Sequence, residues 1–89
     1  MAAMPRVYIP STMRTLTGHD IVDVTATNVR EAIDELEQRF PGVKAALCAQ
    51  NRLMPGISVV VDGRIGTLGL WQPLSEDAEV HFVPALGGG

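Results

Sequence analysis

The chain has 89 residues, enough for one compact domain but too few for a second domain with its own core. A hydrophobic fraction of 46% with 19% charged residues is typical of a folding chain and excludes a disordered one. Ten acidic and seven basic side chains give a net charge of −3. The arginines are scattered singly, so we expect no nucleic-acid partner.

The cysteine content and the hydropathy of the chain indicate the cellular compartment that we expect. The only cysteine, Cys48, has no partner for an internal disulfide, which favours a reducing cytoplasm. One cysteine without clustered histidines also makes a structural zinc site unexpected. The first residues show no signal-peptide pattern, and no apolar run approaches the ~18 residues of a membrane span. We therefore expect a cytoplasmic protein with no membrane partner.

The first third of the chain predicts two short strands. Residues 7–9 form a β-rich run before Pro10, and residues 21–24 form a second run after the turn at Gly18. We expect a hairpin joined by the segment around residues 14–18.

The clearest helix is predicted over residues 28–40. Asn28 lies three residues before Glu31, a capping-box spacing, and apolar residues then recur on one face with helical period. Pro41 and Gly42 end the helix, and residues 43–47 predict one further helical turn.

The last third predicts three strands. Residues 57–61 are β-branched and end at the turn dipeptide Asp62-Gly63, so we expect a central strand. Within residues 66–73 we expect a very short strand inside an irregular loop. Residues 79–83 alternate, which places Val80 and Phe82 toward the core and His81 and Val83 on the opposite face, and Pro84 should end the strand.

This order of elements predicts an α+β roll. One main helix would cover one face of a mixed sheet of four to five strands, the layout of the β-grasp (ubiquitin-like) fold. We expect residues 1–84 to form this domain and residues 85–89 to form a flexible tail.

No side-chain site for catalysis or metal binding is expected. His19 and His81 have no nucleophile or ligand at useful spacing, and Cys48 is more typical of a small buried hydrophobe. The acids of the helix, Asp34, Glu35 and Glu37, belong to its solvated face, and the glycines of residues 63–69 lack a phosphate-loop pattern.

The end of the chain is the remaining candidate. After Pro84 it has one apolar residue, Leu86, and then Gly87, Gly88 and Gly89, which carry no Cβ atoms. Such a segment is thin enough to enter a narrow channel in another protein and present its carboxylate. Adenylation by ATP would activate that carboxylate, and a sulfur nucleophile would then give a thiocarboxylate. Composition alone leaves a frayed terminus equally open.

Five stretches, taken together, resemble the family of the molybdopterin synthase small subunit and the thiamin sulfur carrier (MoaD/ThiS), whose members end in a diglycine. They occur in the family's order and cover nearly the whole chain: RVYIPSTMR at 6–14, TNVREAI at 27–33, RFPGV at 39–43, VVVDG at 59–63 and EVHFVPALGGG at 79–89. Two positions depart from the family. Gly87 stands where alanine is usual, and Asp77 replaces a turn glycine, where aspartate tolerates a left-handed conformation.

The resemblance implies a β-grasp sulfur carrier that is a cosubstrate and not an enzyme. Gly89 would be adenylated by an E1-like adenylyltransferase, which uses the ATP, and converted to a thiocarboxylate, with Gly88 as its diglycine partner. The carrier itself would bind no cofactor. Leu86 and Val83 would belong to the docking surface, and the strand alternation adds Tyr8 and His81 to the same face.

The resemblance leaves the sulfur acceptor open. The 9–10 strand end, Arg14, the 40–42 corner and the 84–85 exit look more like the carriers that serve cysteine synthesis, so a cysteine-synthase-like acceptor is weakly favoured. The alternatives are the small subunit of molybdopterin synthase, bound to its large catalytic subunit, and a ubiquitin-like modifier that forms isopeptide bonds through Gly89. A plain interaction module is the least favoured.

Overall fold

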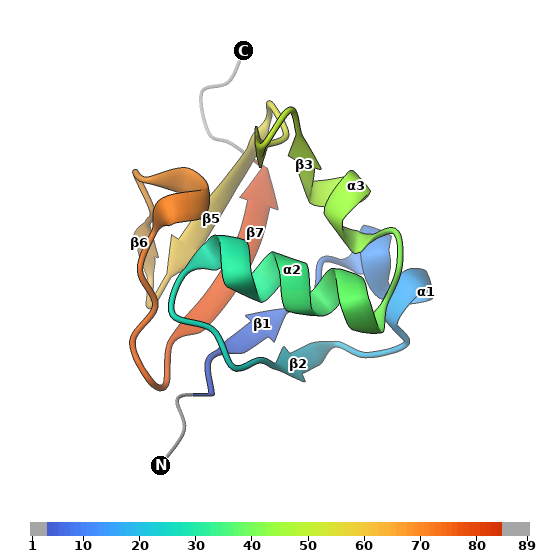
Figure 1. Cartoon of the computed structure of the whole chain (residues 1–89), viewed down its shortest axis with the longest axis horizontal. Coiled ribbons are helices and arrows are strands. Elements are labelled where there is room, and N and C mark those ends of the chain that lie inside the picture. Colours follow the sequence, from blue (N-terminus) through green and yellow to red (C-terminus); the bar gives the residue numbers. More distant parts are fainter. Residues whose placement is uncertain (1–3, 85–89) are drawn as a thin grey trace.

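The computed structural model describes residues 4–84 and shows one main helix packed on a five-stranded mixed sheet (Figure 1). The order across the sheet is β2 (Ile21–Asp23), β1 (Arg6–Tyr8), β7 (Glu79–Pro84), β5 (Ile57–Val61) and β6 (Arg64–Ile65). Strands β1 and β7 are parallel, and the other neighbours are antiparallel. The predicted α+β roll is confirmed.

The core lies between this sheet and helix α2 (Val29–Arg39). The helix buries its apolar face completely, and the sheet supplies one valine from each of its four longer strands. These residues are at most 3% exposed: Val29, Ala32, Ile33 and Leu36 from the helix, and Val7, Val22, Val59 and Val80 from the sheet. Because each strand turns alternate residues to α2, the other half of its residues lies on an uncovered face.

The helix starts where the capping signature predicts. The Asn28 side chain accepts a hydrogen bond from the Glu31 backbone N–H at 2.8 Å. The Glu31 carboxylate does not return the bond to Asn28; it accepts from the backbone N–H and hydroxyl of Thr27, at 2.8 and 2.7 Å. Those two bonds lower the pKa of Glu31. Phe40 follows the last helical residue, and the predicted helical turn is α3 (Val43–Leu47).

The predicted hairpin of β1 and β2 is confirmed, but its connection is more ordered than expected. It contains the 3₁₀ helix η1 (Ser11–Met13) and the helix α1 (Arg14–Thr17), which ends at Gly18 with φ of 69°. Met13 of this connection is buried in the core. Its burial orders the connection, and the local sequence pattern did not predict it.

Strand β7 lies in the middle of the sheet, and β5 is an interior strand next to it. Residues of β7 pair with β1 on one side and with β5 on the other, whereas the two-residue β6 flanks β5. The prediction of a central strand at 57–61 is confirmed, because β5 pairs with a neighbouring strand on each side. Strand β7 ends at Pro84, which pairs with Ile57 and is the last residue that the structure describes.

The predicted strand within residues 66–73 is wrong. That segment contains the 3₁₀ helix η2 (Gly69–Trp71), and the short strand β6 precedes it. The reason is the tight turn at Asp62 and Gly63, whose φ angles of 52° and 82° fold the chain back at once into β6. Gly66 donates its backbone N–H to the Val59 carbonyl at 2.8 Å, and an added Cβ would lie 2.9 Å from the Val59 side chain, so glycine is needed at this close approach.

Sequence analysis missed a second hairpin, formed by β3 (Cys48–Ala49) and β4 (Arg52–Leu53). Its turn holds Gln50 and Asn51 at positive φ, 54° and 63°. Asp77 needs no such conformation. It lies in the turn closed by a hydrogen bond from Ala78 N–H to the Ser75 carbonyl, so the turn is kept, and it is not among the positive-φ residues of segment 4–84.

Candidate functional site

The candidate site is the uncovered face of the sheet together with the end of β7. The alternation predicted for residues 79–83 is confirmed, because Val80 and Phe82 are buried whereas His81 and Val83 are half-buried on the other side. Pro84 is the last residue that the structure describes. The predicted sulfur-bearing Gly89, with Gly88, Gly87 and Leu86, lies outside the described residues, and so does the predicted tail of residues 85–89.

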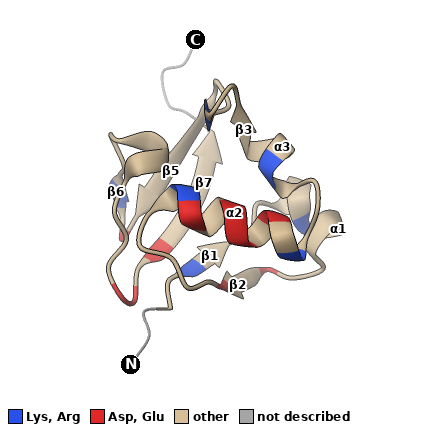
Figure 2. Ribbon diagram, in the orientation of Figure 1, with Lys and Arg blue, Asp and Glu red and all other residues tan. Residues whose placement is uncertain are grey.

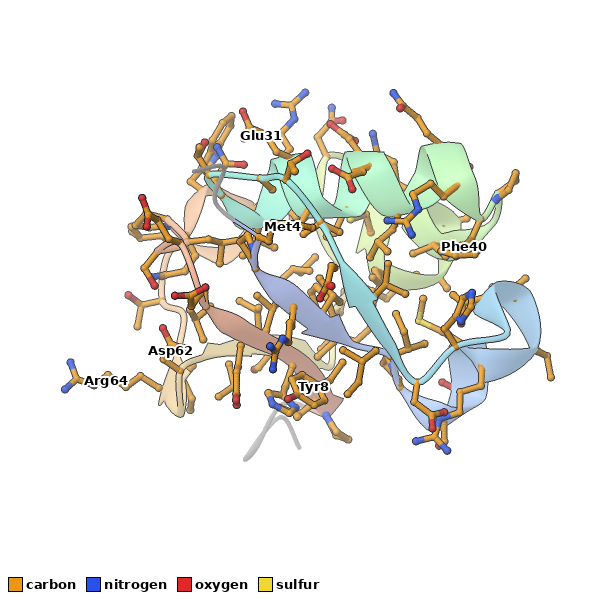
Figure 3. All side chains as sticks on the ribbon, turned by 90° about the horizontal axis from the view of Figure 1, so that it is seen from below. Met4, Tyr8, Glu31, Phe40, Asp62 and Arg64 are labelled. Atoms are coloured by element: carbon orange, nitrogen blue, oxygen red, sulfur yellow. The ribbon has the colours of Figure 1, made fainter. Side chains whose placement is uncertain are left out.

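One residue from each of the five strands forms a continuous row across the uncovered face. The register aligns them in the order Ile21, Tyr8, His81, Val60 and Ile65. The Tyr8 and His81 rings stack with centroids 4.2 Å apart and planes 11° apart. Figure 3 shows Tyr8 on the side of the sheet opposite α2. We call these five residues the open-face row.

A charged row borders the open-face row at one end of the strands. Arg6 pairs with Glu79 across β1 and β7 and lies 3.9 Å from the Asp23 carboxylate. Glu79 lies 3.9 Å from the His81 ring, and its backbone N–H donates to the Asp62 carboxylate at 2.9 Å. Exposed ion pairs of this kind contribute only about 0–1 kcal/mol to folding.

The other border of the open-face row faces the end of β7. There Val83 pairs with Ser58 of β5, and both side chains are half-buried. Tyr8, His81 and Val83, predicted separately from strand alternation, therefore do share one face. Their part in docking is not established by this geometry and remains a prediction.

Sequence analysis missed Ile21, Val60 and Ile65 as members of this face. The signal for Val60 was present, because a strand that buries Val59 must turn Val60 the other way. Ile21 and Ile65 are 46% and 59% exposed, which is high for large apolar residues. A row of apolar side chains rimmed by charge is typical of a protein-binding surface.

Elsewhere in residues 4–84, few side chains are candidates for catalysis or metal binding. His19 is exposed and meets the Phe40 ring edge-on at 5.7 Å. Cys48 is half-buried, less than expected, and burial raises the pKa of its thiol. Asp34 binds Lys44 at 3.0 Å, and Figure 2 shows the acidic residues of α2 lying between basic residues near the two ends of the helix. Within this described range, no three His, Cys, Asp or Glu side chains are grouped as metal ligands would be.

One main helix on a five-stranded mixed sheet, with parallel strands β1 and β7 and a largely apolar uncovered face, defines a β-grasp protein of the ubiquitin-like class. Residues 7–89 match the family model described as the ThiS family. The chain therefore belongs to the ThiS family of small ubiquitin-like carrier and modifier proteins, and it is not a catalyst. The predicted fold and family are confirmed.

Solved structures agree with this assignment. A chain of the Amycolatopsis orientalis BexX/CysO complex is similar over 96% of this chain and 99% of its own length, with 32% identity and a TM-score of 0.85. Mycobacterium tuberculosis CysO shares 21% identity over 92% and 99% of the two chains, with a TM-score of 0.81. SAMP1 from Methanosarcina acetivorans, at 18% identity over 100% and 99%, has a TM-score of 0.79. The last two likenesses concern the fold alone.

A search of curated proteins found no match. Across residues 4–84, none of the helices has the length and apolar character needed to span a membrane.

Proposed function

We propose that this protein carries sulfur as a thiocarboxylate on Gly89 and donates it in cysteine biosynthesis. The observation that carries the proposal is the family match, which extends to residue 89 and so includes the terminal glycines. The likeness to the BexX/CysO structure, at 32% identity, favours cysteine biosynthesis among the acceptors.

The chemistry takes place on the main chain. An E1-like enzyme transfers AMP from ATP to the Gly89 carboxylate and releases pyrophosphate. A sulfur nucleophile then displaces AMP, so that a C–S bond replaces a C–O bond at the terminal carbon. The carrier contributes recognition: the open-face row docks on the activating enzyme, and the glycines bring the carboxylate to its active site. None of these steps requires a side chain of the carrier as acid, base or metal ligand.

Intact-mass measurement tests the first step. The full chain is incubated with the E1-like enzyme of its own host, ATP and a sulfide source. We expect the mass to rise by the difference between one sulfur and one oxygen atom, and the chain lacking Gly88 and Gly89, which no longer ends in a diglycine, to show no gain. An unchanged mass of the full chain, with an activating enzyme that modifies another carrier in parallel, would contradict the proposal.

The acceptor is tested with the sulfur-loaded chain. A cysteine-synthase-like enzyme with its amino-acid substrate should consume the thiocarboxylate, whereas the large subunit of molybdopterin synthase with its precursor should leave it intact. The opposite result would assign the chain to molybdopterin synthesis. Diglycine remnants on cellular lysines would assign it to protein modification instead.

A further inference from the structure

An apolar groove lies where the last strand ends. Its volume is about 450 Å³, and its walls come from five elements: η1, α1, α3, β5 and β7. We call it the exit groove, and its main apolar lining residues are Met13, Leu16, Ala46, Ile57, Phe82 and Pro84. It is distinct from the open-face row, because none of the five residues of that row lines it, although Val83 beside the row does.

The geometry of β7 aims the next residues at this groove. Val80, Phe82 and Pro84 lie on the side of β7 that faces α2, and Leu86 is the next residue in that series. Side chains two apart on a strand are about 6.6–6.8 Å apart. An extended continuation therefore brings the Leu86 side chain over the groove, one step beyond Pro84.

Backbone pairing cannot hold Leu86 there. The register of β5 and β7 ends with Ile57 opposite Pro84, so Leu86 would face Pro55. Proline has no N–H to donate, and Gly56 leaves the extended conformation with φ of 90°. Any fixed position for Leu86 must come from side-chain packing.

The residues that follow Pro84 indicate which side chain could fill the exit groove. Among Ala85, Leu86 and the three glycines, Leu86 is the only large apolar side chain. Five extended residues span at most about 17 Å, so Leu86 can easily reach the groove that begins at Pro84. The glycines have no side chains that could fill the groove.

We propose that the exit groove binds Leu86 of the same chain. This contact fixes the start of the C-terminal segment and leaves Gly87–Gly89 as the free end, with a reach of about 10 Å from a defined point. A carrier anchored in this way presents its terminal carboxylate from a constant position near the end of β7. The inference does not depend on thiocarboxylate chemistry, because it concerns the free chain.

Methyl NMR on the full chain tests the contact directly. We expect nuclear Overhauser contacts from the Leu86 methyls to Met13, Leu16 or Ala46. Leu86→Ala should shift the methyl resonances of these groove residues and leave those of Ile21 and Ile65 on the other face unchanged. Absence of both the contacts and the shifts would overturn the proposal. Shifts that depend on protein concentration would also overturn it, since they would indicate Leu86 of a second copy.

Backbone relaxation gives a second readout with a matched control. Leu16 is 45% exposed, so Leu16→Ser opens the groove wall with little risk to folding. We expect the amide order parameter of Leu86 to exceed about 0.6 in the parent chain and to fall below it in this variant. Leu68→Ser, at a 58% exposed leucine outside the groove lining, should leave the value unchanged. A parent value below about 0.6, or equal effects of both variants, would refute the anchor.

Discussion

The two faces of the sheet carry the same kinds of apolar residue but use them for different purposes. Toward α2, Val7, Val59 and Val80 are completely buried. On the uncovered face, Ile21 and Ile65 keep about half of their surface in water. Both faces are apolar, so hydrophobicity alone does not distinguish the residues that fold the chain from those that are free to bind a partner.

The difference is one of coverage. Burial of an apolar side chain contributes about 1.5–3 kcal/mol only when water is removed from it. The face toward α2 gains this free energy when the chain folds, and the open-face row can gain it only when another protein covers it. Variants on the two faces should therefore separate stability from binding.

The largest effect on stability is expected from Leu36→Ala. Leu36 is 1% exposed, and its truncation leaves a cavity between α2 and the sheet. The free energy of unfolding should fall by about 2–5 kcal/mol. Leu68→Ala, at a 58% exposed leucine, should change it by less than about 0.5 kcal/mol. Urea denaturation measures both, and equal losses would contradict the assignment of the core.

A smaller loss is expected from Asn28→Ala, because the first turn of α2 loses its cap. The Asn28 side chain satisfies the Glu31 N–H, and removing it should cost about 1 kcal/mol. Asn28→Asp keeps a capping oxygen and should retain most of the stability. If both variants lose the same amount, the cap does not carry the effect.

Sequence predicted the parts of the fold that local pattern controls. The Asn28 cap, the apolar period of α2 and the alternation of β7 are readable within a few residues, and each was confirmed. The hairpin at Gln50 and Asn51 was missed because its strands have only two residues each, too short for a period. Helix η2 was missed because it is fixed by burial of Leu70, a contact with distant elements.

The candidate site was only partly predictable for the same reason. Tyr8 and His81 were placed on one face from alternation, but their stacking depends on the parallel register of β1 and β7. That register joins the two ends of the chain and is set by tertiary packing. Ile65 lies in β6, whereas the strand was predicted a few residues later in the chain. Its place in the open-face row could therefore not be predicted.

The effect of Glu31 on stability should be smaller still and should be seen only at acidic pH. Hydrogen bonds from Thr27 lower the pKa of Glu31 below its ordinary value of 4.5. A lowered folded-state pKa stabilises the fold above about pH 4.5, and this contribution is lost as the pH falls through the folded pKa. Glu31→Gln should flatten the decline of stability below pH 4.5, measured by thermal unfolding across pH. An unchanged slope would mean that other carboxylates dominate the acid transition.

The smallest change in stability is expected on the open face, where the change in function should be clearest. Ile65 is 59% exposed, so Ile65→Ser should alter the free energy of unfolding by no more than about 0.5 kcal/mol. If the open-face row docks on the activating enzyme, the same variant should slow thiocarboxylate formation severalfold, because the enzyme then covers a polar side chain instead of an apolar one.

Trp71→Ser is the matched control for Ile65→Ser. Trp71 is 64% exposed but lies on the α2 side of the sheet, with the Arg30 guanidinium 5.3 Å from its ring. Its loss should leave the rate of thiocarboxylate formation unchanged. Equal slowing by both variants would show that exposed apolar surface in general, and not the open-face row, controls the encounter. Slowing by Trp71→Ser alone would move the docking surface to the helix side of the molecule.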